Sequence, residues 1–491
     1  MEIYRREFTL GILAGASAPV VRALSPGPKL LVLVLLEQLR QDHLDVVFSQ
    51  FGPNGLRRIL SKGAHFPDCR HLASSFSSSS IATLATGAWP SQHGVVADSW
   101  YGASAPAPAS ASGEALLAGT LCSQIAAEGR TRSFVIGRDA LQTGLFAGDA
   151  QARQFWMDTT GRFNTLGETP EWLAAFNNLK PLESAHNAPW MAMDARPGTP
   201  PLRTLKFDAA RPQEFLRLYQ ASPLAQQAQF ELLRDLIQKE RLGQGDTFDF
   251  VCLIAGAGSQ LGFETGAQSP LLRQMVLHLD RQMEALMDQL KTAPGENSFN
   301  LVLAAAHGVP PAPPDGSRAR MAVEGEAVAQ AVDRALMAAG SGRVARYIYP
   351  FLYLDTGSAR DREPLRVAAA QAALSHPAVA GCYTAGGYCT VRDEFEGRFR
   401  NSFHPKRSGD VMLSYRPGYV EDYGQGRGIS YGSLYNYDIR VPLCFYGPQF
   451  RAGVFEAPVQ SVDVAPTLAR AMGVAPPDSA VGRVLGEALA E

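Results

Sequence analysis

The chain has 491 residues, of which 46% are apolar and 19% are charged, and its formal net charge is −2. A chain of this length can bury a large core, and it is long enough to form two or more structural units. The near-zero charge and the lack of a basic stripe argue against nucleic acid or an anionic membrane as a partner.

The first 25 residues resemble an export signal. Arg5 and Arg6 precede Phe8, and a mildly apolar stretch rich in Gly and Ala runs from about Leu10 to Val21. That stretch is too short to span a bilayer comfortably. We therefore expect a twin-arginine signal over residues 1–25, a periplasmic or secreted protein, and no stable membrane anchor after cleavage. An ordinary amphipathic N-terminal helix is the alternative.

Continuous apolar runs without alternation predict buried parallel strands. They are Leu30–Leu36, Phe134–Gly137, Phe248–Ile254, Asn300–Ala305 and Val441–Tyr446. Helices are expected between most of them, at Ser80–Thr86, Leu117–Ala127, Pro270–Leu290 and Val462–Met472. This alternation predicts an α/β fold with a doubly wound, mostly parallel sheet flanked by helices. Ligands then bind at the carboxyl ends of the strands, where Glu37, Ser259 and His307 are expected.

Two insertions interrupt this pattern within a main domain over residues 26–491. Residues of about 150–245 are rich in Trp, Pro and Gln and are expected to form a cap. Residues 346–391 indicate a small strand–helix–strand unit. The six cysteines form no CxxC pair, which argues against a zinc ribbon or redox motif. Cys382 and Cys389 are either bridged in an oxidising compartment or remain two buried thiols.

Several segments together resemble the alkaline phosphatase superfamily, in the branch of single-chain periplasmic phosphatases and nucleotide pyrophosphatase/phosphodiesterases. They are LVLVLLEQLRQDHL, GAHFPDCRHLASSFSSSSIATLATGAWPSQHGVVADSWY, RSGDVMLSYRPGYV, YGSLYNYDIRVPLCFYG and VDVAPTLARAMGV. Their order and number carry the resemblance, which covers essentially the whole mature chain. It implies an alkaline-phosphatase-like fold and two zinc ions that clamp a phosphoryl group during attack by a hydroxyl nucleophile.

The positions that the resemblance assigns to the first zinc ion have lost their ligands. An aspartate is replaced by Ser259, one histidine by Phe263 and another by Tyr431. A phenyl ring cannot coordinate zinc, and neutral hydroxyls are poor ligands.

The second zinc position keeps only part of its ligand set. Glu37 stands for the first-strand aspartate, and an Asp-His pair becomes Ala306-His307. The nucleophile position is Ser77, and the asparagine that holds a phosphate oxygen becomes Asp98, whose carboxylate would repel phosphate. The Lys-x-Arg pair of monoesterases falls near Leu141 and Thr143, positions without a cation.

Three hypotheses for function remain open. In the first, the protein is a pseudo-phosphatase without catalytic metal that keeps its cleft for an unknown small-molecule or protein ligand. In the second, it is a phosphoric-ester hydrolase with one weakly bound divalent metal, such as zinc, at Glu37 and His307. In the third, it is a metal-free esterase in which Ser77, His307 and Glu37 act together. An inactive site plugged by a Glu37–His307 hydrogen bond is the simplest expectation.

Overall fold

The computed structural model describes residues 27–102, 107–129, 131–179, 182–311, 322–355, 361–423 and 429–490. The signal predicted over residues 1–25 lies outside these ranges. Within them, no helix combines the length and the apolar character that crossing a bilayer requires.

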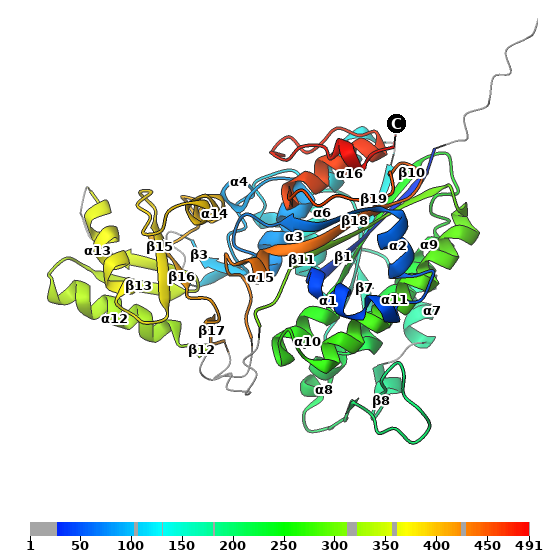
Figure 1. The fold of residues 1–491 in the computed structure, drawn as a ribbon, viewed down its shortest axis with the longest axis horizontal. Coiled ribbons are helices and arrows are strands. Elements are labelled where there is room, and N and C mark those ends of the chain that lie inside the picture. Colours follow the sequence, from blue (N-terminus) through cyan, green and yellow to red (C-terminus); the bar gives the residue numbers. More distant parts are fainter. Residues whose placement is uncertain are drawn as a thin grey trace, which may run out of the picture.

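A large mixed sheet forms the centre of the molecule (Figure 1). Its middle strand, β1 (Leu30–Gln38), is fully buried and lies parallel to both neighbours. Those neighbours and the parallel strands beyond them are β10 (Phe248–Ala255), β11 (Phe299–His307), β5 (Thr131–Gly137) and β6 (Arg153–Met157). The α/β class predicted from the continuous apolar runs is confirmed.

The strands at the other side of β11 run in the opposite sense. β18 (Arg440–Tyr446) pairs antiparallel with β11 and with β2 (Ala64–Arg70). The prediction of a parallel strand at Val441–Tyr446 is therefore wrong in direction. A continuous apolar run reports burial on both faces of a sheet, and β18 is buried on both faces whichever way it points.

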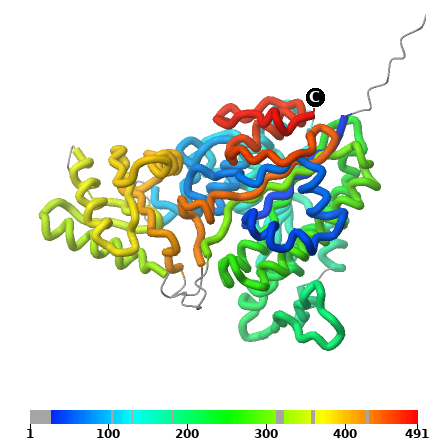
Figure 2. Tube along the Cα trace, in the orientation of Figure 1, coloured from blue at the N-terminus to red at the C-terminus, as the bar shows by residue number. Residues whose placement is uncertain are grey.

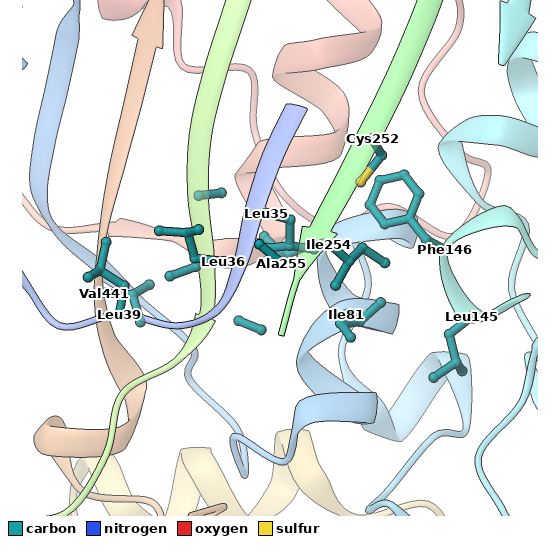
Figure 3. Packing of buried hydrophobic residues seen from close by; sticks show 14 of the residues in the cluster. Leu35, Leu36, Leu39, Ile81, Leu145, Phe146, Cys252, Ile254, Ala255 and Val441 are labelled. Atoms are coloured by element: carbon teal, nitrogen blue, oxygen red, sulfur yellow. The ribbon is translucent and has the colours of Figure 1, made fainter. Parts of the chain in front are cut away.

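Helices cover both faces of the sheet, as a doubly wound fold requires (Figure 1). One layer holds α3 (Ser77–Thr86), α6 (Ala140–Ala147) and α16 (Val464–Met472). The other holds α1 (Gln41–Val47), α9 (Pro223–Lys239), α10 (Ala257–Thr265) and α11 (Pro270–Leu290). In the first layer Ile81 and Phe146 pack with Ile254 of the sheet (Figure 3). This packing fixes the start of α3 beside the carboxyl ends of the parallel strands.

A second, smaller sheet lies beside the central one, in yellow and orange (Figure 2). Its strands, in spatial order, are β13 (Arg343–Ile348), β14 (Phe351–Asp355), β16 (Val411–Tyr415) and β15 (Val379–Thr384). The helices α12 (Gly325–Ala338) and α13 (Glu363–Leu374) pack with it. The unit thus extends beyond the predicted 346–391. Its first expected strand is a hairpin of two strands, because Tyr349 and Pro350 turn the chain between β13 and β14.

The segment predicted as a cap over 150–245 divides into two parts. Its beginning extends the central sheet through β6 and β7 (Phe163–Thr165), and α9 packs on that sheet. The intervening elements lie outside the sheet; they are α7 (Glu171–Leu179), β8 (Pro189–Trp190), β9 (Arg203–Thr204) and α8 (Pro212–Gln220). The two cysteines left open above, Cys382 and Cys389, both carry free thiols.

Candidate functional site

Two adjacent parallel strands bring Glu37 and His307 to the same edge of the sheet. Glu37 is the eighth residue of β1, and His307 ends β11 in register with Gln38. Both side chains are fully buried. The carboxyl ends of parallel strands meet at one edge, so this is where the fold gathers polar side chains.

Ser77 begins α3 and points at this edge. Its Oγ donates a hydrogen bond to Oε1 of Glu37 at 2.6 Å. Helix α3 ends at Thr86 and is followed by Gly87, whose φ of 67° lies in the left-handed region that favours glycine. The predicted nucleophile position and the surviving carboxylate are therefore in direct contact.

His307 makes its hydrogen bond to a backbone group and not to Ser77 or Glu37. Its Nδ1 donates to the carbonyl oxygen of Gly308 at 2.7 Å, and its ring stacks on Tyr431 with centroids 3.8 Å apart. Burial lowers the pKa of His307 to about 4, so the ring is neutral at pH 7. Nε2 has no hydrogen-bond partner among the described residues.

The described part of the chain has no hydrogen bond from His307 to Ser77 or to Glu37. The expectation that Glu37 and His307 pair and plug the site is thus wrong, because Glu37 is held by other partners. The serine–histidine–carboxylate relay also lacks its central contact, and we set the metal-free esterase hypothesis aside.

Arg138 is a site residue that sequence reasoning missed. It follows β5 directly, and its Nη1 lies 3.5 Å from Oε2 of Glu37, while its guanidinium also donates to Asp139. Burial by itself lowers the pKa of Arg138, but the carboxylates of Glu37 and Asp139 outweigh it and hold that pKa above its ordinary value. The sequence feature that could have indicated Arg138 is its position directly after the predicted strand Phe134–Gly137.

The three positions that the resemblance assigns to the first zinc ion lie together and carry no carboxylate, imidazole or thiolate. Ser259 is buried in the first turn of α10, Phe263 follows one turn later, and Tyr431 comes from the C-terminal part. Burial raises the pKa of the Tyr431 phenol well above its ordinary value. Ala306, at a lost position of the second site, is a fully buried apolar residue of β11.

Asp98 caps the N-terminus of α3. Its Oδ1 accepts a hydrogen bond from the backbone N–H of Ser78 at 3.0 Å. A helix N-terminus attracts anions through its free N–H groups and its dipole. Burial raises the pKa of Asp98, and the bonds from Ser78 counteract this shift. The chain's own carboxylate thus occupies a place where an external anion would otherwise bind.

The residues present do not fit a pair of zinc ions. Zinc needs about three carboxylate, imidazole or thiolate ligands. Among the described residues, no three His, Cys, Asp or Glu side chains are grouped so that they could hold a metal ion. Glu37 is engaged by Ser77 and Arg138, and a guanidinium beside it repels a divalent cation. Two buried atoms do suit a metal, because Oε2 of Glu37 and Nε2 of His307 both lack a hydrogen-bond partner among the described residues.

A cavity of about 530 Å³ opens beside the start of α3, between the central and the smaller sheet. Its walls are largely aromatic, and Asp98 is the charged side chain among the described lining residues. The lining consists of Phe76, Ala97, Asp98, Ser99, Phe263, Ile348, Tyr349, Tyr423, Ser430 and Tyr431. A volume of this size is typical of sites for small organic ligands.

His93 lies outside this cluster and has a structural environment. Its Nε2 contacts Oγ1 of Thr83 at 3.0 Å, and its Nδ1 accepts the N–H of Val95 at 3.1 Å. Nε2 therefore carries the proton of a neutral ring. Burial, with a smaller effect of Arg407, lowers the pKa of His93 to about 3.

Because its folded-state pKa is lowered, His93 stabilises the fold less as pH falls from about 6.5 toward 3. We expect His93→Gln to be less stable than wild type at pH 7, because the amide replaces the ring's contacts imperfectly. The difference should shrink by roughly 3 kcal/mol between pH 7 and pH 4. Urea unfolding of both proteins at several pH values measures this. A difference that stays constant with pH would show that His93 has the same pKa in the folded and the unfolded chain, and so contradict the lowered pKa.

Comparisons with known proteins agree with this architecture. Residues 31–431 match the family model described as type I phosphodiesterase / nucleotide pyrophosphatase. Alkaline phosphatase PafA of Elizabethkingia meningoseptica is 23% identical, over 94% of this chain and 95% of its own length. The crystal structure of wild-type PafA has a TM-score of 0.81 at 20% identity, covering 95% of this chain and 100% of that chain. Murine ectonucleotide pyrophosphatase / phosphodiesterase 5 has a TM-score of 0.58 at 14% identity, covering 94% and 100%. The alkaline-phosphatase-like fold expected from the resemblance is confirmed.

Proposed function

Since the chain belongs to the type I phosphodiesterase / nucleotide pyrophosphatase family, we propose that it is a member without two-zinc phosphoryl transfer, whose cleft binds a ligand instead. Homologues of this chain are alkaline phosphatases, so the activity to be tested for is phosphoric-ester hydrolysis. The proposal makes the protein a pseudo-phosphatase.

The contact between Arg138 and Glu37 carries this proposal. In a two-zinc site, the cations that balance the carboxylates are metal ions that also activate the nucleophile. Here the cation beside Glu37 is a guanidinium of the chain itself, 3.5 Å away. A guanidinium stays protonated and cannot coordinate the oxygen of Ser77 as a bound metal ion would.

The surroundings of Ser77 support the same conclusion. Its proton is donated to Glu37, and the acceptor with a free lone pair, Nε2 of His307, has no hydrogen bond to it. A phosphoryl group approaching Ser77 would meet the carboxylate of Asp98 at the N-terminus of α3. The attraction of a phosphate substrate is thereby weakened.

The experiment is an assay of wild type, Ser77→Ala and Ser79→Ala on p-nitrophenyl phosphate and bis-p-nitrophenyl phosphate, each with added zinc and with chelator. Ser79 is a matched control in the same turn, and its hydroxyl bonds to the backbone of Ser74 and Phe76. We expect zinc to stimulate no turnover in the wild type. Turnover that depends on Ser77 would be stimulated by zinc, lost in Ser77→Ala and retained in Ser79→Ala. Such turnover would overturn the proposal.

A phosphoric-ester hydrolase with a single metal is the second candidate. The observation that favours it is the unpartnered, unprotonated Nε2 of His307 in a buried ring. Glu37 and His307 would be its ligands, fewer than zinc usually takes. In the same assay, turnover abolished by chelator and by His307→Ala would favour this candidate.

We further propose that the protein is exported through its twin-arginine signal to the periplasm or the medium. The support is the Arg5-Arg6 pair followed by Phe8 and an apolar stretch. Replacing Arg5 and Arg6 with lysine should leave the protein in the cytoplasmic fraction of a bacterial host. Equal export of the double variant would count against the signal.

A further inference from the structure

The cavity beside α3 is walled by aromatic rings that come from several parts of the chain. Phe76 precedes α3, Phe263 lies on α10, and Tyr349 follows β13 of the smaller sheet. Tyr423 and Tyr431 complete the wall. Phe76 and Tyr349 meet edge to face, with ring centroids 6.0 Å apart. The fold thus brings five rings to one space.

Tyr423 and Asp98 are the exposed side chains among the described residues of the lining. Tyr423 exposes 57% of its surface, yet its surroundings desolvate the phenol and raise its pKa well above the ordinary value. Asp98 combines the same two properties, an exposed side chain and a pKa raised by desolvation. A ligand in the cavity would lose most of its water.

Asp98 is the charged side chain among the described residues that line the cavity. Aromatic rings present negative faces, and Asp98 contributes a carboxylate. Among the described lining residues, no lysine, arginine or histidine balances it. A second carboxylate, Glu421, lies behind the wall, where the hydroxyls of Tyr347 and Tyr415 donate to its Oε2 at 2.8 and 2.7 Å.

We propose that this cavity binds a small organic ammonium ion, alkylated at nitrogen, with its positive head against the rings and Asp98. The proposal rests on the proposed function, because it names the ligand class of the retained cleft. Cation–π attraction to several rings and one carboxylate recognises such a head together with its methyl groups. A phosphate would meet the same groups with repulsion. A neutral molecule of equal shape would gain the apolar contact alone.

The test is calorimetric titration of chelator-treated protein with choline and with 3,3-dimethylbutan-1-ol, its neutral carbon isostere. We expect choline to bind at least about tenfold more tightly than the alcohol. Asp98→Asn should weaken choline binding by about tenfold or more while leaving the alcohol unchanged. The amide still accepts the bond from Ser78, so α3 keeps its cap. Equal affinity of both ligands, or no binding of choline, would overturn the proposal.

A second pair of variants keeps the test independent of folding. Tyr423→Leu removes one ring of the wall and should weaken choline binding roughly threefold to tenfold. Tyr388→Leu removes an exposed tyrosine outside the lining and should change nothing. These experiments test the ammonium-ion proposal and the pseudo-phosphatase proposal independently. Absence of choline binding leaves the pseudo-phosphatase assignment intact, whereas zinc-stimulated turnover removes that assignment whatever choline does.

Discussion

Arg138→Ala is expected to lower the free energy of unfolding by about 2–3 kcal/mol. Removing one partner of a buried ion pair leaves the other charge uncompensated, which costs about 3–5 kcal/mol for fully buried pairs. Glu37 is fully buried, whereas a quarter of the Arg138 side chain is exposed, so we expect a smaller cost. Urea unfolding at pH 7 measures the change.

A double-mutant cycle isolates the pair from other effects of the substitution. Glu37→Gln keeps an oxygen that accepts from Ser77 and removes the charge. In that background, Arg138→Ala should cost about 1 kcal/mol or less. An equal cost in both backgrounds would mean that Arg138 stabilises the fold by packing or through Asp139, and that it does not neutralise Glu37.

The largest gain is expected from restoring the lost ligands. Ser259→Asp, Phe263→His, Tyr431→His and Ala306→Asp place carboxylates and imidazoles at the positions that the resemblance assigns to zinc ligands. Combined with Arg138→Gln, these substitutions should raise the affinity for zinc by more than about a hundredfold. Even the loss of a residue that hydrogen-bonds a metal ligand lowers metal affinity about 10- to 100-fold. Zinc titration by calorimetry measures the affinity.

The matched control is the same fourfold variant with Arg138 retained. It should bind zinc more weakly than the fivefold variant, since the guanidinium 3.5 Å from Glu37 repels a metal ion there. Thermal melts with and without zinc report whether both variants fold, because a ligand of the folded state raises the melting temperature. Folded variants that bind no more zinc than wild type would contradict the ligand assignment.

Much of the fold and part of the site could be predicted from the sequence. Apolar runs located the central strands, and their parallel arrangement placed Glu37 and His307 at one edge. Strand direction could not be read for Val441–Tyr446, since its burial is the same in either direction. The hairpin at Tyr349 and Pro350 was equally hidden, because both of its strands belong to one continuous apolar run.

The site partners were the least predictable feature. Spacing along the chain does not reveal that Glu37 accepts a hydrogen bond from Ser77 and forms an ion pair with Arg138, while His307 bonds elsewhere. Those choices depend on side-chain reach and on which charges the core must neutralise. The family pattern drew attention to Leu141 and Thr143 as the lost cations. The cation that does reach the site, Arg138, comes three residues before Leu141 and directly after β5.

The central claim is that this scaffold no longer holds catalytic zinc, and zinc titration of the wild-type protein tests it most directly. Calorimetry on chelator-treated and dialysed protein should detect no site tighter than about 10 µM, consistent with a ligand set below the usual count. His307→Ala should leave the titration unchanged. Two equivalents of zinc bound tightly to the wild type, with loss of binding in Glu37→Ala, would contradict the account.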